Sequence, residues 1–292
     1  MLYNIKSWLI AIRLKTLPAA ICPVMVGTAL AYNNMDKINF VLFFTILFAS
    51  LFIQIGTNFS NDLSDFLKGT DTIDRLGPKR AAQSGLLTVN QLKFGVIFSF
   101  SLSILFGIYL VSIGGYIIVI IGLLSIASGI LYTEGPYPLG YHGLGDIFVF
   151  VFFGIIAVMG TFYLHTLKIN MESFICGSII GSIATAIIVV NNIRDAQTDI
   201  LTGKQTLAVK FGIFFSQLEY SILVFIPFIL IIFLYFSLKK LGLFLTFFLI
   251  PISINLIIMI YTKKGSQLNN ILEKTARFLL LFSILLIIGL VS

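Results

Sequence analysis

Charged side chains are scarce in this chain. Only 11% of its 292 residues are Asp, Glu, Lys or Arg, and 58% are hydrophobic, whereas about a quarter of the residues in a soluble domain are charged. This shortage excludes an ordinary soluble protein. Two cysteines, both inside apolar segments, imply no disulfide. The chain also lacks a GxxxxGK[ST] loop, which disfavours a nucleotide-driven pump.

The sequence instead contains long apolar segments. About 20 apolar residues in a helix cross about 30 Å of hydrocarbon, and about nine segments meet this length. They are residues 8–32, 39–61, 91–112, 114–133, 145–166, 172–193, 214–237, 241–262 and 272–291. We therefore predict an all-α, multi-span membrane protein in the lipid bilayer, with residues 1–292 forming a single transmembrane domain.

Basic residues are distributed unevenly between the two ends of these segments. If the N-terminus is cytoplasmic, about fifteen Lys and Arg residues lie on that side and about four on the other. The net charge of +7 is then mostly a topology signal and requires no nucleic acid. The first segment carries Arg13 and Lys15 and lacks a convincing cleavage site, so we expect it to be a retained helix.

Two polar motifs stand at the ends of the second and sixth apolar segments. The first, from residue 58, reads NFSNDLSDFLKGTDTIDRLGPKR, and the second, from residue 189, reads VVNNIRDAQTDILTGKQT. Their amide and carboxylate residues are spaced i, i+4, i+7 and i, i+4, i+8, so each set occupies one face of a helix. The two sets are Asn58, Asp62 and Asp65, and Asn191, Asp195 and Asp199.

These two sets indicate a cation site. A single Asp at the end of a membrane helix is as often a solvated residue, but two sets with the same composition favour a functional site. Carboxylates placed together repel each other unless a cation neutralises them. Hard oxygen donors without nearby Cys or His favour Mg²⁺ over zinc or iron. With the surrounding Arg and Lys, two facing acidic sets suit a magnesium–diphosphate complex.

A third polar segment, residues 132–146, reads YTEGPYPLGYHGLGD. Its Gly and Pro residues oppose a regular helix, and its tyrosines suit a lid or a pocket wall at the membrane interface. His142 is more often a solvated loop residue than a ligand, and Asp146 could orient the loop or contact a substrate.

The two acidic motifs resemble the paired aspartate motifs of the UbiA superfamily of intramembrane prenyltransferases. RLKTLPAAICPVMVG, KGTDTIDRLGPKRAAQSG and the 132–146 segment resemble the branch that prenylates 1,4-dihydroxy-2-naphthoate for menaquinone biosynthesis. Many superfamily members have an Asp where this chain has Gly69, but the naphthoate branch tends to have Gly there and an Asp that corresponds to Asp71. The resemblance implies helices around a central cavity open to the cytoplasmic side of a bacterial cell membrane.

The resemblance also implies roles for individual residues. Catalytic roles would fall to Asp62, Asp65, Asp195 and Asp199, with one Mg²⁺ held by Asn58, Asp62 and Asp65 and a second by Asn191, Asp195 and Asp199. The diphosphate of a polyprenyl diphosphate would be bound by Arg13, Lys15, Arg75, Lys79, Arg80 and Lys204. Candidates for contact with 1,4-dihydroxy-2-naphthoate are Tyr132, His142 and Asp146. The reaction would be Mg²⁺-dependent prenyl transfer with loss of CO₂.

Two other interpretations remain open from the sequence. Another UbiA-type enzyme, acting on 4-hydroxybenzoate or homogentisate, would share the metal chemistry and differ in its aromatic pocket. A secondary transporter would instead carry ionisable residues near the middle of the membrane and broken helices there. The acidic residues of this chain gather at one end of the segments, which favours the enzyme.

Overall fold

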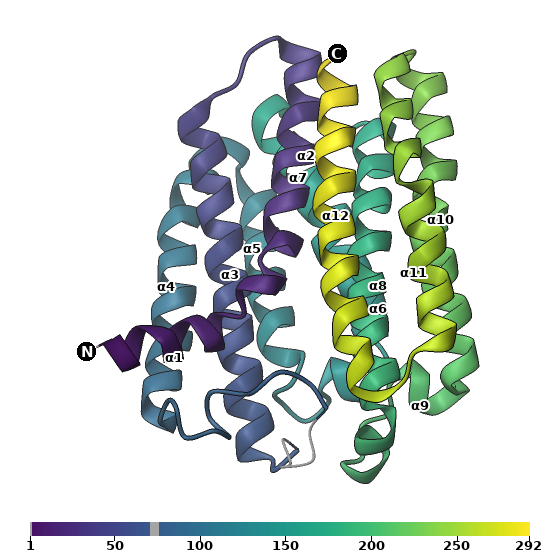
Figure 1. The fold of residues 1–292 in the computed structure, drawn as a ribbon. Helices are drawn as coiled ribbons and strands as arrows, with labels where there is room; N and C mark the ends of the chain where they lie inside the picture. The colour runs from purple at the N-terminus through teal and green to yellow at the C-terminus, as the bar shows by residue number, and fades with distance from the viewer. Residues whose placement is uncertain (1, 71–75) are drawn as a thin grey trace.

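A computed structural model describes residues 2–70 and 76–292, and within these ranges the regular structure is entirely helical. Most helices run side by side in one bundle, while α1 (Leu2–Ile12) lies across it near one end (Figure 1). The expected all-α class is confirmed. The remaining helices of five or more residues are α2 (Pro18–Met35), α3 (Phe40–Leu67), α4 (Val89–Gly114), α5 (Tyr116–Leu131), α6 (Gly145–Val149), a π-helix (Phe150–Ile156), α7 (Ala157–Thr166), α8 (Met171–Leu201), α9 (Leu207–Phe211), α10 (Ile213–Leu238), a 3-10 helix (Leu241–Leu249), α11 (Ile250–Thr262) and α12 (Leu268–Val291).

Seven helical stretches in the described ranges are long and apolar enough to cross a membrane, and each matches an expected segment. The two other expected segments do not form single long helices. The first segment is split into α1 and α2, which are bent by 51° relative to each other. The other contains α5, which has only 16 residues. The chain is thus a multi-pass membrane protein, and the count of nine spans stays a prediction.

The bend between α1 and α2 occupies residues 13–17. Arg13 has a left-handed backbone with φ of 56°, and Leu14–Thr16 form one 3-10 turn. Pro18 then begins α2, where its missing N–H leaves no intrahelical hydrogen bond unmade. The bend carries Arg13 and Thr16 to the side of α3.

Helix α8 runs through the middle of the bundle, and 78% of its apolar 18-residue stretch is buried inside the protein. It packs against α10, α12 and the π-helix. The π-helix comes so close that a Cβ on Gly154 would lie 2.4 Å from the Cα of Gly181 and 2.5 Å from the carbonyl oxygen of Gly177. Small residues at such crossings let helix backbones approach within van der Waals contact.

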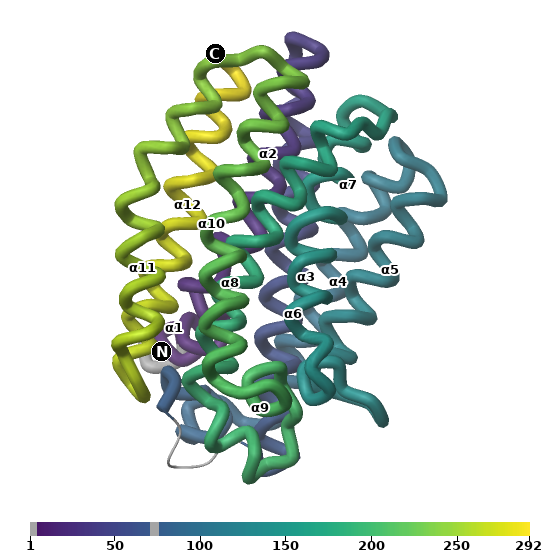
Figure 2. Tube along the Cα trace, turned by 90° about the vertical axis from the view of Figure 1, so that its right-hand side faces the viewer, coloured from purple at the N-terminus to yellow at the C-terminus, as the bar shows by residue number. Residues whose placement is uncertain are grey.

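The carboxyl ends of α3 and α8 lie at the same end of the bundle. This end also holds α1, α9 and the loops that follow α3, α5 and α8 (Figures 1 and 2). Helix α4 begins here with a capping box, in which Thr88 Oγ1 accepts from the Gln91 N–H and Gln91 Oε1 accepts from the Thr88 N–H. The two acidic motifs are therefore brought to one end of the molecule.

Candidate active site

The acidic face of α3 is buried. Asn58, Asp62 and Asp65 are exposed by only 3%, 1% and 2% of their surfaces, and their spacing places them along one side of the helix. Buried carboxylates require hydrogen-bond donors or positive charges nearby. Each of the three residues has such partners, and the partners come from different parts of the chain.

Asp62 receives hydrogen bonds from the backbone of the loop between α3 and α4. The Ala81 N–H donates to its Oδ2 at 3.0 Å, and the Ala82 N–H donates to Oδ1 at 3.4 Å. The charge of Arg13 also acts on Asp62. Asp62 thus fixes the 80–82 segment on α3, and the bend after α1 brings a guanidinium to the same carboxylate.

Asp65 joins three loops. Its Oδ2 accepts from Nη2 of Arg80 at 3.0 Å, and its Oδ1 accepts from the Tyr141 hydroxyl at 3.1 Å and from Nζ of Lys204 at 3.3 Å. The Lys204 ammonium also lies 4.7 Å from the centroid of the Tyr141 ring. Asp65 is therefore the point where the loops after α3, α5 and α8 meet.

Asn58 faces the bend between α1 and α2. Its Nδ2 donates to the Ile12 carbonyl at 2.9 Å and to Thr16 Oγ1 at 3.0 Å. Its carbonyl oxygen, the atom that would ligate a metal, is 3.4 Å from Nε2 of Gln54. In this arrangement Asn58 positions the bend that carries Arg13.

The acidic face of α8 is bound differently. Asp195 accepts two hydrogen bonds from its neighbour Arg194, at 2.7 and 2.6 Å. Nη1 of Arg194 also donates to Asn269 at the start of α12. Asp199 is buried at 8% exposure, and Asn191 is half-buried. The neighbouring amide, Asn192, donates to both carboxylate oxygens of Asp146 at 3.2 and 3.3 Å.

Tyr132 lies where the two acidic faces and the 132–146 loop come together. Burial raises the pKa of its phenol, and the negative charges of Asp146, Asp65 and Asp199 raise this pKa further. Its ring is held between glycines, because a Cβ on Gly145 would lie 2.7 Å from the Tyr132 hydroxyl oxygen. The phenol therefore stays protonated and can donate a hydrogen bond beside three carboxylates.

The predicted diphosphate-binding residues divide into two groups. Arg13, Arg80 and Lys204 lie against the acidic face of α3 as described above. Lys15 instead forms an ion pair with Glu273 of α12, at 2.6 Å. Lys79 is exposed. The prediction for Arg75 lies outside the described residues.

The His142 ring contacts other residues of its own loop. Its ring stacks on Tyr137 with a centroid separation of 3.5 Å, and its Nδ1 is 2.8 Å from the Pro138 carbonyl oxygen. Nζ of Lys210 donates to the His142 carbonyl. These contacts give His142 a role in holding the loop, and its contact with a substrate stays a prediction.

Three residues at this site were not singled out from the sequence. Tyr141 was one of several tyrosines in the 132–146 loop, and nothing local distinguished it. Arg194 and Asn192 stand next to Asp195 and Asn191 in the motif, and their adjacency to predicted ligands was the available signal. Their partners Asn269 and Asp146 are distant in sequence.

The donor chemistry of the site fits Mg²⁺ bound together with a diphosphate. In the ranges 2–70 and 76–292, no three His, Cys, Asp or Glu side chains are grouped closely enough to hold a metal by themselves. Mg²⁺ commonly takes one or two carboxylates and completes its shell with waters and phosphate oxygens. The two faces offer buried hard-oxygen donors, and basic side chains beside them suit a phosphate group.

Comparison with known proteins agrees with this chemistry. The model of the UbiA prenyltransferase family matches residues 20–287. The chain is 37% identical over 227 residues to the 1,4-dihydroxy-2-naphthoate octaprenyltransferase of Haemophilus influenzae, covering 75% of this chain and 74% of the relative. It is 39% identical over 213 residues to the protein of the same name from Escherichia coli, covering 71% and 69%.

Solved structures share the fold. A UbiA homolog from Archaeoglobus fulgidus bound to GPP and Mg²⁺ aligns with a TM-score of 0.72, covering 98% of this chain and 99% of the other at 15% identity. The apo structure of a UbiA homolog from Aeropyrum pernix aligns with a TM-score of 0.69, at 13% identity and with 92% and 96% coverage. At such low identity the likeness concerns the arrangement of helices.

Proposed function

The chain belongs to the UbiA prenyltransferase family, and from this premise we propose that it transfers a polyprenyl group from a polyprenyl diphosphate to 1,4-dihydroxy-2-naphthoate. In this reaction the allylic C–O bond of the diphosphate breaks, a C–C bond to the naphthalene ring forms, and the carboxyl group leaves as CO₂. The product is a demethylmenaquinol, and the step belongs to menaquinone biosynthesis. Relatives at 37% and 39% identity carry names for this reaction.

One structural observation supports the proposal most strongly. The ion pair between Lys204 and Asp65 joins the loop after α8 to the acidic face of α3, which supports a single site built from both motifs. Mg²⁺, when bound, supplies positive charge that stabilises the departing diphosphate. Asp62 and Asp65 on α3, with Asp195 and Asp199 on α8, would hold it, and Asn58 and Asn191 supply amide oxygens on the same faces.

Basic and aromatic side chains act on the substrates directly. Arg13, Arg80 and Lys204 would bind the diphosphate oxygens, and their charges offset the negative charge that develops as the C–O bond breaks. The protonated Tyr132 phenol and the Asn192–Asp146 pair lie beside the acidic faces, where they would orient the hydroxyl groups of the acceptor. The 132–146 loop, which Tyr141 holds against Asp65, would keep water from the allylic carbon.

The proposal includes the sidedness of the site. Most basic residues lie at the end of the bundle that holds the acidic motifs, a distribution typical of the cytoplasmic side. We place this end in the cytoplasm and the chain in a bacterial cell membrane. The polyprenyl tail would then extend between the helices toward the lipid.

The experiment that tests the proposed acceptor offers several aromatic acids to the purified chain with one polyprenyl diphosphate and Mg²⁺. The mass of each product is then measured. We expect prenylated, decarboxylated product from 1,4-dihydroxy-2-naphthoate and little from 4-hydroxybenzoate or homogentisate. Prenylation of 4-hydroxybenzoate with its carboxylate retained, and none of naphthoate, would contradict the proposal.

A further inference from the structure

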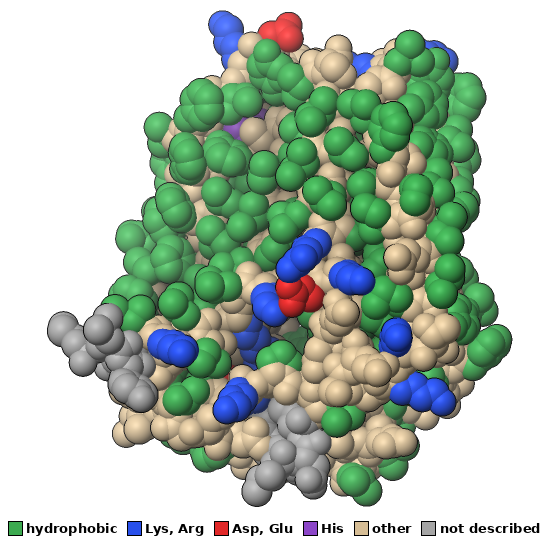
Figure 3. Space-filling view, viewed as in Figure 1, with side chains coloured by type: hydrophobic (Ala, Val, Ile, Leu, Met, Phe, Trp, Pro, Cys, Tyr) green, Lys and Arg blue, Asp and Glu red, His purple; other side chains and the backbone are tan. Residues whose placement is uncertain are grey.

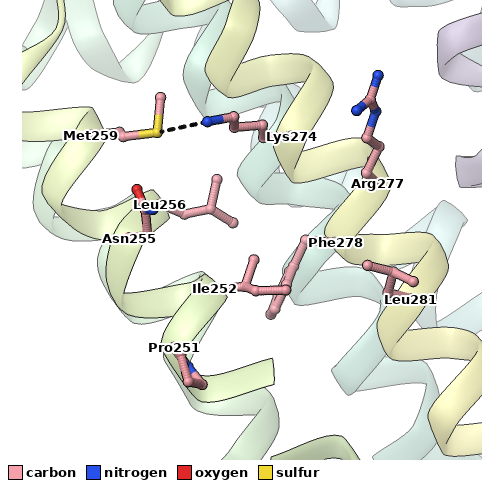
Figure 4. Close-up of a pocket in the computed structure, with 9 residues that line it drawn as sticks. All are labelled: Pro251, Ile252, Asn255, Leu256, Met259, Lys274, Arg277, Phe278 and Leu281. Atoms are coloured by element: carbon pink, nitrogen blue, oxygen red, sulfur yellow. Dashed lines mark hydrogen bonds between the residues drawn. The ribbon is translucent and has the colours of Figure 1, made fainter. Parts of the chain in front are cut away.

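A groove of about 430 Å³ lies between α11 and α12, apart from the acidic faces described above. Leu256 and Phe278 form its buried floor, at 1% and 0% exposure, and the half-exposed Ile252 and Leu281 form its sides. In Figure 4, Pro251 and Lys274 lie at opposite ends of the groove. Exposed apolar walls on a transmembrane helix pair face lipid.

One end of the groove is strongly basic. Lys274 and Arg277 line it from α12. In Figure 4 the Lys274 side chain points across the groove toward Met259, and the Arg277 side chain extends from α12 at the edge of the groove. The Lys274 ammonium lies 3.6 Å from the Met259 sulfur. Long basic side chains near the end of a membrane helix extend their charged groups toward the membrane surface.

The local charge balance is positive. Glu273 pairs with Arg277 at 2.5 Å and with Lys15 at 2.6 Å, so one carboxylate is shared by two cations, and Lys274 in the groove adds a further positive charge. Figure 3 shows acidic side-chain atoms surrounded by basic ones on this face of the molecule. The excess charge remains available to an anion.

We propose that this groove is a binding site for an anionic phospholipid of the surrounding bilayer, such as a phosphatidylglycerol. An acyl chain would lie along Ile252, Phe278 and Leu281, while Lys274 and Arg277 bind the phosphate. The groove is complementary to such an amphiphile, because its apolar trough can receive an acyl chain and the two cations at one end can bind the phosphate. The inference does not depend on prenyl transfer, because none of these residues belongs to the acidic faces.

The site is tested by lipid retention. The full chain is reconstituted in nanodiscs of phosphatidylcholine with a small fraction of phosphatidylglycerol, extracted mildly, and the bound lipids are quantified by mass spectrometry. We expect enrichment of phosphatidylglycerol on the wild type and a loss of about tenfold in this enrichment for Lys274→Gln/Arg277→Gln, since each cation contributes a several-fold preference. A matched control, Lys263→Gln/Lys264→Gln, removes two exposed lysines outside the groove and should retain the wild-type enrichment.

A second variant tests the apolar part. Leu281→Trp fills the trough and keeps both cations, so it should lower the amount of retained phosphatidylglycerol, with folding verified by circular dichroism. Equal enrichment in the wild type and in the Lys274/Arg277 variant would overturn the proposal, as would the absence of enrichment in the wild type. Displacement of the retained lipid by a polyprenyl diphosphate would also overturn it and assign the groove to the prenyl substrate.

Discussion

The Nζ atom of Lys204 lies 3.3 Å from Oδ1 of Asp65, and both side chains are largely buried. Lys204 follows α8 and Asp65 belongs to α3, so this pair connects the two acidic motifs. A buried ion pair of this kind is costly to break by removing one partner, because the other charge is left uncompensated. The pair therefore supports the proposal that both motifs act in one site.

Substitutions of this pair should affect different kinetic parameters. Asp65→Asn removes a charge at the proposed metal site and should lower kcat by about a hundredfold or more. Lys204→Gln should raise the KM for the polyprenyl diphosphate by about tenfold, with partial recovery in Lys204→Arg. Steady-state kinetics with each substrate varied measures both effects. An unchanged KM for the diphosphate in Lys204→Gln would remove Lys204 from the diphosphate site.

Removal of the metal should stop the reaction reversibly. EDTA should abolish product formation, and added Mg²⁺ should restore it, because the acidic faces of α3 and α8 carry the hard-oxygen donors that Mg²⁺ prefers. Asp62→Asn and Asp195→Asn should each lose nearly all turnover while remaining inserted and folded. The control is Asp36→Asn, an exposed residue at the other end of α2. Near-normal turnover in folded Asp62→Asn would show that the magnesium assignment there is wrong.

Substitution of Tyr132 should weaken binding of the aromatic acceptor more than binding of the polyprenyl diphosphate. Tyr132→Phe removes the hydroxyl and keeps the ring against its glycine neighbours, so we expect a higher KM for the naphthoate and little change for the diphosphate. Its pKa is raised by burial and by three carboxylates, so the phenol remains protonated where a free tyrosine, with a pKa of about 10, would begin to ionise. The pH profiles of wild type and variant between about pH 6 and 9 should therefore be parallel. Loss of a pH-dependent limb in the variant would contradict this account.

The close crossing of the π-helix and α8 should limit the size of residue 154. Gly154→Ala places a methyl group within 2.4 Å of Gly181, and such overpacking costs about 1–3 kcal/mol of folding free energy. Gly107→Ala is the matched control, since a Cβ there meets nothing within 4 Å. Thermal unfolding in detergent should show a lower midpoint for Gly154→Ala alone. Equal midpoints would mean that the crossing adjusts freely.

Single cysteines should report which side of the membrane holds the site. Native Cys22 and Cys176 are fully buried, so they contribute little background labelling. Gln205→Cys lies in the exposed loop after α8, and Asn34→Cys lies at the opposite end of α2. A membrane-impermeant thiol reagent should label Asn34→Cys in intact cells and Gln205→Cys in inverted vesicles. The reverse pattern would place the site outside the cytoplasm.

The helices and the two acidic faces follow from local pattern in the sequence. Long apolar segments predict membrane helices, and the i, i+4 spacing predicts that Asn58, Asp62 and Asp65 share a side of α3. Pro18 predicts a kink in the first apolar segment, but the extent of the bend over residues 13–17 could not be predicted, because residues 8–32 form one apolar segment. Its position depends on contacts between Asn58 and the backbone at Ile12, which no local pattern specifies.

The partners of the acidic residues also depend on the tertiary structure. Arg80 was among several basic candidates, and only the fold distinguishes it from Lys15, which pairs with Glu273 instead. The roles of Tyr141 and Asn192 likewise follow only from the fold, because each forms a hydrogen bond with a partner more than 40 residues away. Sequence pattern therefore located the functional faces, and packing of the loops selected the residues that contact them.

The most direct test of the proposed reaction uses 1,4-dihydroxy-2-naphthoate labelled in its carboxyl group. The purified chain is incubated with this acceptor, a polyprenyl diphosphate and Mg²⁺, and released CO₂ and prenylated product are measured over the same time course. The proposal predicts one labelled CO₂ for each prenyl group transferred, with both absent in Asp65→Asn. A prenylated product that retains the label, or CO₂ release without prenyl transfer, would contradict it.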